Sequence, residues 1–189
     1  MTCIEEYMRW LPTEKIPRLG TEGERYRDRQ VVYQLPRQDM CLAYTRHVEA
    51  EHRRSFEDFV KARNEIASDF AIVKHPIPTS TKCPECGEIV KAGTLGVIAP
   101  KFGESVAWHP SCFVCSVCKE LLVDLAYCLY DDHIYCERHY AEQLRPRCAA
   151  CDEVRPISCF PSELLTSPPL AQMSCMPRWS KSPLSLLYT

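Results

Sequence analysis

Cysteine and histidine recur in four closely spaced pairs across residues 83–139, with two residues between the members of each pair. The pairs are Cys83 with Cys86, His109 with Cys112, Cys115 with Cys118, and Cys136 with His139. Structural zinc takes thiolates and imidazoles as ligands, four at a time in a tetrahedron. A two-residue gap lets one tight turn direct both side chains at the same ion. The eight residues therefore predict two complete zinc sites.

These four pairs combine in one of two ways. In an interleaved arrangement the first and third pairs share an ion, as in RING-type ubiquitin ligases, which carry a further Cys one to three residues before the His. Residues 106–108 are Val, Ala and Trp, so this arrangement does not fit. In a sequential arrangement the first four ligands hold one ion and the next four hold another, with Phe113 and Val114 between them.

The sequential arrangement resembles a LIM domain. The resemblance rests on the eight positions, on the gaps of 22 and 17 residues (87–108 and 119–135), and on the Trp-His-Pro run at 108–110. It implies a first zinc held by Cys83, Cys86, His109 and Cys112. It implies a second zinc held by Cys115, Cys118, Cys136 and His139. The expected cofactor is two Zn²⁺ per chain.

Both expected sites are closed, which argues against catalysis by the metal. Catalytic zinc keeps three protein ligands and one exchangeable position for water. Cys41 with His47 is an alternative nucleophile and base, but no third group that would orient the base accompanies them. We therefore expect that the protein is not an enzyme. The histidines outside the four pairs are expected at the surface or at caps: His47, His52, His75 and His133.

Short elements are expected between the ligand pairs. Strands are predicted over 93–100 and 104–109, a hairpin over 121–136 that turns at Asp131–Asp132, and a closing helix over 136–144. The expected apolar filling is Trp108, Phe113, Leu122 and Tyr135. Residues 83–139 form a segment that is too short to bury enough apolar area to fold without metal. Bound zinc, with an apparent binding free energy of roughly 10–16 kcal/mol, is expected to supply the rest.

Residues 1–75 have a helical pattern instead. Thr21 and Glu24 form a capping box before a helix that ends at Pro36. A second helix is predicted over 47–67, and its apolar face consists of Val48, Phe56, Phe59, Val60 and Ile66. Acidic residues interrupt the arginines of both helices, which favours a solvated surface over a basic patch.

This N-terminal region carries a second resemblance. The run LPTEKIPRLGTEGERYRDRQVVYQLPRQD, residues 11–39, is similar to the core of the PET domain that precedes LIM domains in the prickle and testin group. The resemblance implies a cytoplasmic adaptor, because members of this group bind partner proteins through both modules. It places those partners at actin-rich junctions and adhesions or in planar-polarity complexes. The chain begins about where the first PET helix is expected, so we interpret 1–75 as a partial PET-like domain.

The C-terminal segment departs from the family pattern. Cys148 and Cys151 resemble the opening pair of a second LIM domain, yet residues 152–189 contain no His and no further Cys-x2-Cys pair. We interpret 140–153 as the start of an incomplete second LIM domain and 154–189 as a disordered divergent tail, which suggests an alternative splice form or a frame change. Cys148 and Cys151 are then expected to be free thiols. The alternatives are a four-cysteine site with Cys159 and Cys175, or a zinc shared by two chains.

Composition limits the partners and the compartment. Thirteen cysteines without a secretory signal indicate metal binding in a reducing compartment. No run approaches the ~20 apolar residues of a membrane span. The net charge is −2, and it falls to about −4 when six thiolates and two Zn²⁺ are counted. Nucleic acid is therefore a poor partner, and other proteins of the cytoskeleton, adhesions or polarity complexes are the expected partners.

The interpretation as a whole is a small zinc-stabilised α+β protein. Its expected order is the partial PET-like domain (1–75), a linker (76–82), the LIM domain (83–139), the incomplete second LIM segment (140–153) and the tail (154–189). We predict a zinc-binding adaptor in the cytoplasm, associated with junctions or adhesions. A nuclear transcriptional cofactor, and a truncated isoform that competes with the full-length protein, are the alternatives.

Overall fold

Helix α2 (Glu22–Gln34) begins at the predicted capping box in the computed structural model, which describes residues 3–155. The Glu24 N–H donates to Thr21 Oγ1 (3.4 Å), and the Glu24 carboxylate accepts the Gly20 N–H (2.6 Å). The first bond satisfies a backbone N–H of the first helical turn that has no partner within the helix. The second holds Gly20, the residue before the N-cap. The helix ends two residues before Pro36, which cannot continue it. The predicted helix is confirmed.

Gly23 lets the preceding chain fold back against α2. The 3₁₀ turn Thr13–Lys15 and the extended residues after it cross the start of the helix. A Cβ atom on Gly23 would collide with the backbone carbonyl of Ile16. No side chain fits in that space, so the close approach requires glycine.

Substituting Gly23→Ala is therefore expected to lower the free energy of unfolding by about 1–3 kcal/mol, because the methyl group must displace backbone. Helix propensity alone would favour alanine by about 1 kcal/mol. Urea denaturation of the zinc-loaded protein measures the effect, with the exposed Arg29→Ala on the same helix as the control. An alanine variant at least as stable as the wild type would contradict the close approach.

The remaining helices of the N-terminal region are short. They are α1 (Cys3–Arg9), α3 (Arg37–Met40) and α4 (Arg53–Ala62), with 3₁₀ turns at Leu42–Tyr44 and Ala50–His52. The helix predicted over 47–67 differs at both ends, since its α-helical part begins at Arg53 and its last residues, Arg63–Ala67, form a π-helical turn. A π turn holds more residues than an α turn and rotates the buried face. Ile66, predicted on that face, is 74% exposed, and Arg63 is buried instead.

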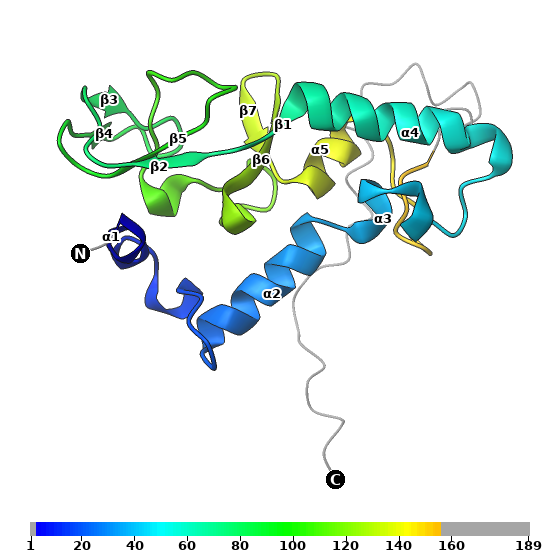
Figure 1. Cartoon of the computed structure of the whole chain (residues 1–189), viewed down its shortest axis with the longest axis horizontal. Helices are drawn as coiled ribbons and strands as arrows, with labels where there is room; N and C mark the ends of the chain where they lie inside the picture. The colour runs from blue at the N-terminus through cyan, green and yellow to red at the C-terminus, as the bar shows by residue number, and fades with distance from the viewer. Residues whose placement is uncertain (1–2, 156–189) are drawn as a thin grey trace, which may run out of the picture. The chain divides into compact units, whose positions relative to one another are not determined.

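Residues 68–74 pair with the zinc-ligand region, which we define as residues 83–144. Strand β1 (Ser68–Phe70) is the edge of a three-stranded antiparallel sheet with β6 (Ala126–Tyr130) and β7 (His133–Tyr135). Strand β2 (Ile72–Lys74) pairs antiparallel with β5 (Gly96–Ile98), with Ile72 opposite Ile98. Figure 1 shows this run from the end of α4 to β2 along the strands of the zinc-ligand region. The N-terminal region therefore contributes one strand to the β1-β6-β7 sheet and one to the β2-β5 sheet.

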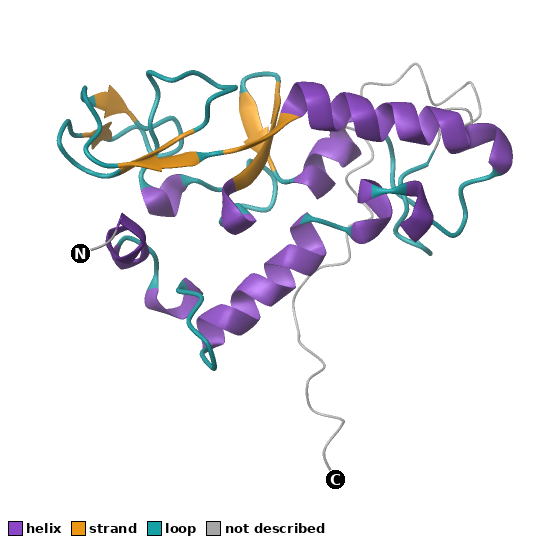
Figure 2. Ribbon diagram, viewed as in Figure 1, coloured by secondary structure: helices purple, strands orange, loops and turns teal. Residues whose placement is uncertain are grey.

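Most of the elements predicted for the zinc-ligand region are present in the structure. The hairpin β6–β7 turns at Asp131 and Asp132, both with positive φ, and helix α5 (Glu137–Leu144) closes the region, as expected. The strand predicted over 93–100 is shorter, Gly96–Ile98, and the one over 104–109 is reduced to a bridge from Trp108 to Val97. Strands β3 (Thr81–Lys82) and β4 (Ile89–Val90) form a further hairpin. Figure 2 shows the strands gathered here and in residues 68–74.

Aromatic rings fill the space between the two halves of the zinc-ligand region. Phe102, Trp108, Phe113 and Tyr127 stack edge to face, with centroids 4.9, 5.6 and 5.9 Å apart. Trp108, Phe113 and Leu122 are buried as predicted, whereas Tyr135 is only partly buried. The predicted linker 76–82 also packs here, because Ile77 is buried in this core and Thr81–Lys82 is strand β3.

A smaller core joins α4 to the segment after α5. It contains Phe56, Phe59, Ala141 and Val154. Val154 is the first residue of the predicted tail. It is buried, because it forms an antiparallel β-bridge with Arg147 and packs against the phenylalanines of α4. The rest of the predicted tail lies outside the described residues, apart from the exposed Arg155. Among residues 3–155, no helix is long and apolar enough to span a membrane.

Candidate metal centres

Four of the predicted ligands gather at the first centre, which we call the first cluster: Cys83, Cys86, His109 and Cys112. Their donor atoms all lie within 4.8 Å of one another, and Cys86 Sγ lies 3.4 Å from His109 Nδ1. A tight turn positions the first pair, with the Gly87 N–H donating to the Cys83 carbonyl (2.9 Å) and Gly87 at φ +77°. The 3₁₀ turn Pro110–Cys112 positions the second pair.

The other four ligands form the second cluster: Cys115, Cys118, Cys136 and His139. His139 Nδ1 lies 3.1 Å from Cys136 Sγ and 3.5 Å from Cys115 Sγ. The turn after Cys115 repeats the first one, with the Lys119 N–H donating to the Cys115 carbonyl (2.9 Å). Cys136 is the N-cap of α5, which brings His139 in the first helical turn back toward it.

The donor geometry fits zinc in both clusters. With zinc–sulfur bonds of about 2.3 Å and zinc–nitrogen bonds of about 2.0 Å, a tetrahedron places sulfur and nitrogen about 3.5 Å apart. The observed sulfur–nitrogen distances are 3.1–3.5 Å. The expected cofactor, two zinc ions, is thus consistent with two sets of four donors. Bound zinc would supply structural cross-links at these positions.

Hydrogen bonds among its own members shift the pKa values of the second-cluster ligands. Bonds with Cys118 and Cys136 hold the pKa of the Cys115 thiol well below its usual range. Bonds with Cys115 and Cys118 raise the pKa of Cys136. Burial would lower the pKa of His139, but hydrogen bonds to Cys115 and Cys118 raise it to about 9. The donors therefore retain protons that a divalent cation displaces on binding.

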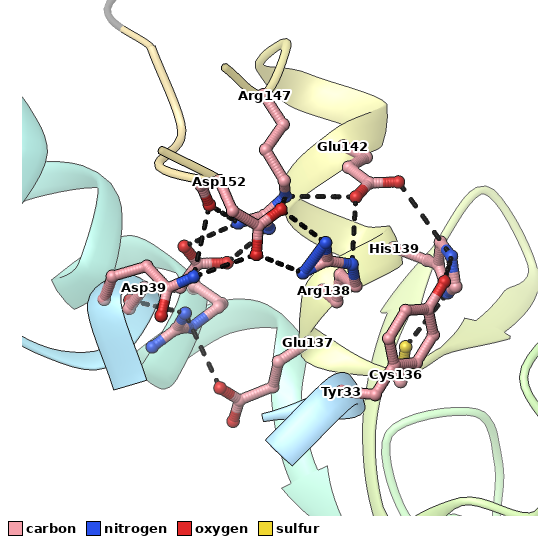
Figure 3. Close-up of polar contacts among 11 residues, drawn as sticks. Tyr33, Asp39, Cys136, Glu137, Arg138, His139, Glu142, Arg147 and Asp152 are labelled. Carbon is pink, nitrogen blue, oxygen red and sulfur yellow. Dashed lines mark hydrogen bonds and ion pairs between the residues drawn. The ribbon is translucent and has the colours of Figure 1, made fainter. Parts of the chain in front are cut away.

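Helix α2 supports the second cluster from outside. Tyr33 Oη lies 3.5 Å from His139 Nε2, the ring nitrogen that faces away from the cluster, and Glu142 lies 3.9 Å from the same atom. Figure 3 shows His139 between Tyr33, Glu142 and Cys136. Gln34 Nε2 donates to Cys118 Sγ at 3.7 Å. Such contacts fix the orientation of metal ligands. No sequence pattern connects residues 33 and 34 to this cluster.

Gln34 also joins α2 to the chain that follows the second-cluster turn. Its side chain is fully buried. Its Nε2 donates to the Leu121 carbonyl and its Oε1 accepts the Val123 N–H, both at 3.0 Å. The Gln34 amide thus makes the two backbone hydrogen bonds that a neighbouring β-strand would otherwise make to residues 121–123.

Substituting Gln34→Leu is expected to lower the free energy of unfolding by about 2–4 kcal/mol, because the buried Val123 N–H and the half-buried Leu121 carbonyl lose their partners. Urea denaturation measures this loss, and mass spectrometry under native conditions checks that both zinc ions remain. The control is Gln143→Leu, at an exposed position of α5. If both variants unfold at the same urea concentration, the bridge contributes nothing to stability.

An ion-pair network connects α3, α5 and the segment after α5 (Figure 3). Arg147 contacts the Asp39 carboxylate with both terminal nitrogens, at 2.5 and 3.1 Å. Arg138 contacts Asp152 at 2.5 Å and Glu142 at 3.4 Å. Burial raises the pKa of Asp39, and hydrogen bonds from Arg147 oppose that rise. Burial would lower the pKa of Arg147, but the hydrogen bonds and charge of Asp39 raise it. The bidentate geometry is the one that an ionised Arg–carboxylate pair adopts.

The alternative nucleophile and base are not assembled within residues 3–155. Cys41 Sγ accepts the Ala43 N–H, and His47 is exposed with its backbone N–H bonded to Glu153. His75 and His133 are also at the surface, and the partly exposed His52 lies 3.2 Å from Glu51. Cys128 is buried, and burial raises its pKa to about 12, so it is not a reactive thiol.

Comparison with known proteins identifies two domains. The PET domain family matches residues 2–74, and the LIM domain family matches residues 83–144. The chain is 43% identical over 151 residues to protein prickle of Aedes aegypti, and 42% identical over 154 residues to prickle-like protein 2 of Mus musculus and of Homo sapiens. These alignments cover 80% of this chain but 16–18% of the relatives, so the chain spans less than a fifth of their length. No solved structure matches the chain.

Proposed function

We propose, from the premise that this chain belongs to the PET–LIM proteins and is a homologue of the prickle proteins, that it is a zinc-stabilised adaptor in planar-polarity, cytoskeletal or adhesion complexes. The PET and LIM domains support the general role, which is binding other proteins. In this proposal the first cluster and the second cluster each hold one structural zinc. The complexes lie in the cytoplasm, and the zinc ions shape the binding surface without taking part in a reaction.

The observation that carries this proposal is the completeness of both clusters. Each offers four protein donors of the kinds that structural zinc takes, at distances that fit a tetrahedron. A site with four protein ligands leaves no position for a substrate or an activated water. The aromatic stack between the clusters then ties the two metal-held halves together.

An exposed edge supports the choice of a protein partner. Strands β1 and β2 form one run, Ser68–Lys74, at the edges of two sheets. Phe70 and Ile72 on this run are 66% and 57% exposed, although both are large apolar side chains. An edge strand with apolar side chains is a surface on which an extended peptide can add a strand.

The arginines of α5 and the segment after it argue against nucleic acid. Arg138 and Arg147 are engaged with Asp152, Glu142 and Asp39. Arg145 lies over the Phe59 ring, 4.8 Å from its centroid. Binding to phosphates depends on unpaired basic groups that displace counterions. These groups already have partners within the chain, so the rival role as a nucleic-acid-binding finger gains no support.

The proposal is tested with the zinc-loaded chain immobilised and exposed to extract from polarised epithelial cells. We expect retention of polarity, cytoskeletal or adhesion proteins, and loss of that retention in Phe70→Glu with Ile72→Glu. The control is Val32→Glu, at an exposed position of α2 away from the strand edge. Retention of none of these proteins, together with DNA binding that persists above physiological salt in a gel shift, would favour the nuclear alternative.

A further inference from the structure

The turn Cys148–Asp152 repeats the backbone geometry of the two zinc-binding turns. In each turn the N–H of the first Cys donates to the carbonyl five residues later, at 2.8, 3.0 and 2.8 Å for Cys83, Cys115 and Cys148. The carbonyl of the same Cys accepts the N–H four residues later, at 2.9, 2.9 and 2.8 Å. The residue after the second Cys has positive φ in all three turns: Gly87, Lys119 and Asp152. Cys148 and Cys151 are therefore arranged as a metal-binding pair.

Hydrogen bonds from the PET domain and from α5 hold the third turn, Cys148–Asp152, in place. Gln38 Nε2 donates to the carbonyl and to the carboxylate of Asp152, and Arg138 contacts the same carboxylate. The Glu153 carboxylate accepts the N–H groups of Arg46 and His47 (2.6 and 3.0 Å). These contacts come from the PET domain and from α5. The pair is thus fixed before any metal binds, which lowers the entropy cost of binding.

A positive charge lies beside the Cys148 thiol. Arg155 Nη2 lies 3.1 Å from Cys148 Sγ. Thiolate is the form of cysteine that binds metal, and a neighbouring guanidinium stabilises the thiolate.

The pair supplies half of a zinc site. Structural zinc takes four ligands, and no other His, Cys, Asp or Glu among residues 3–155 joins Cys148 and Cys151 in a potential metal-binding group. We propose that two copies of this chain share one Zn²⁺, with Cys148 and Cys151 of each copy as its four ligands. Each thiol that still carries a proton releases it on binding. This site is independent of the two LIM clusters and of the proposed adaptor role.

Charge and shape favour a second copy as the partner. Four thiolates and one Zn²⁺ carry a net charge of −2, and Arg155 from each copy brings a balancing positive charge next to the sulfur atoms. Ala149 and Ala150, the exposed tip of the turn, have side chains small enough to let two tips approach. Two identical turns related by a two-fold axis provide the two pairs that a tetrahedral site needs.

Cys159 and Cys175 of the same chain are the competing ligands. They are 16 positions apart in the sequence and do not form a Cys-x2-Cys pair. Binding both to the same ion would require closing two loops. A second preformed turn requires neither, which favours the shared site.

The test is native mass spectrometry with sedimentation analysis of the full chain, purified with zinc and a phosphine reductant that removes disulfides. We expect a dimer that carries two zinc ions in each chain and one more shared ion. Cys148→Ser with Cys151→Ser should give a monomer that keeps two zinc ions, which also shows that the variant is folded. Cys159→Ser with Cys175→Ser should remain a dimer with the shared ion.

Three results would overturn the shared site. A monomer with three zinc ions would place the third ion within one chain, and its loss in the Cys159/Cys175 variant would identify those ligands. A monomer with two zinc ions would leave Cys148 and Cys151 as free thiols. A dimer that persists in the Cys148/Cys151 variant would assign dimerisation to another surface.

Discussion

Replacing Cys115 with serine is expected to remove one zinc ion per chain and to unfold the second half of the LIM domain. Cys115 is fully buried and lies within 3.5 Å of His139 Nδ1. A serine hydroxyl does not replace a thiolate as a zinc ligand. Structural zinc contributes roughly 10–16 kcal/mol of apparent binding free energy. That is as large as the whole stability of a typical domain, about 5–15 kcal/mol, so the remaining contacts cannot hold the region together.

Native mass spectrometry and near-ultraviolet circular dichroism measure this result. We expect one LIM-cluster zinc ion per chain instead of two, and loss of the signal from the buried ring stack of Trp108 and Phe113. The control is Cys41→Ser, because Cys41 is exposed and belongs to neither cluster. A Cys115→Ser protein with near-native dichroism, two zinc ions and unchanged partner binding would contradict the role of the second cluster.

Cys115→Ser is also expected to destabilise the PET domain. Helix α2 contacts the second cluster through Tyr33 and Gln34, and β1 pairs with β6 in the sheet that precedes Cys136. Loss of the metal therefore removes the surface on which α2 lies. Hydrogen exchange is expected to accelerate in α2 as well as around Cys136. That result would mean that zinc bound in the LIM domain also stabilises the domain before it.

Local chemistry explains why the metal ligands could be predicted from the sequence. Each turn is closed by backbone bonds within five or six residues, as at Cys83 and Cys115, so its ligands are near neighbours in the sequence. The hairpin at Asp131–Asp132 and the capping box at Thr21 are local in the same sense. Such features depend on residue types and short spacings, which the sequence displays directly.

Contacts over long sequence separations explain what could not be predicted. Gln34 looks like a surface residue of a polar helix, yet it is buried against residues 121–123, nearly ninety positions away. Ser68–Lys74 is too short to be recognised as strands without its partners in β6 and β5. Ile66 follows the α-helical spacing that the π turn interrupts. In each case tertiary packing overrides the local pattern.

Replacing Arg147 with methionine is expected to lower the free energy of unfolding by about 3–5 kcal/mol, because Asp39 keeps a buried charge without its main partner. The Asp39 side chain is fully buried and that of Arg147 is 8% exposed, so water cannot replace the lost contact. Urea denaturation measures the loss, and zinc content should stay at two ions from the LIM clusters. Lys61→Met is the control, since Lys61 and Glu65 form an exposed pair, worth about 0–1 kcal/mol.

A double-mutant cycle separates the charge from the packing at this site. Asp39→Leu with Arg147→Met removes both charges, and we expect the double variant to be more stable than Arg147→Met alone, because no unpaired charge stays buried. Equal losses in the single and double variants would show that Arg147 acts through packing alone. Asp39 lies in α3 of the PET domain, and Arg147 directly precedes Cys148. The pair therefore braces the segment after the LIM domain against the PET domain, and a large coupling energy would establish that the two domains and the third turn unfold as one cooperative structure.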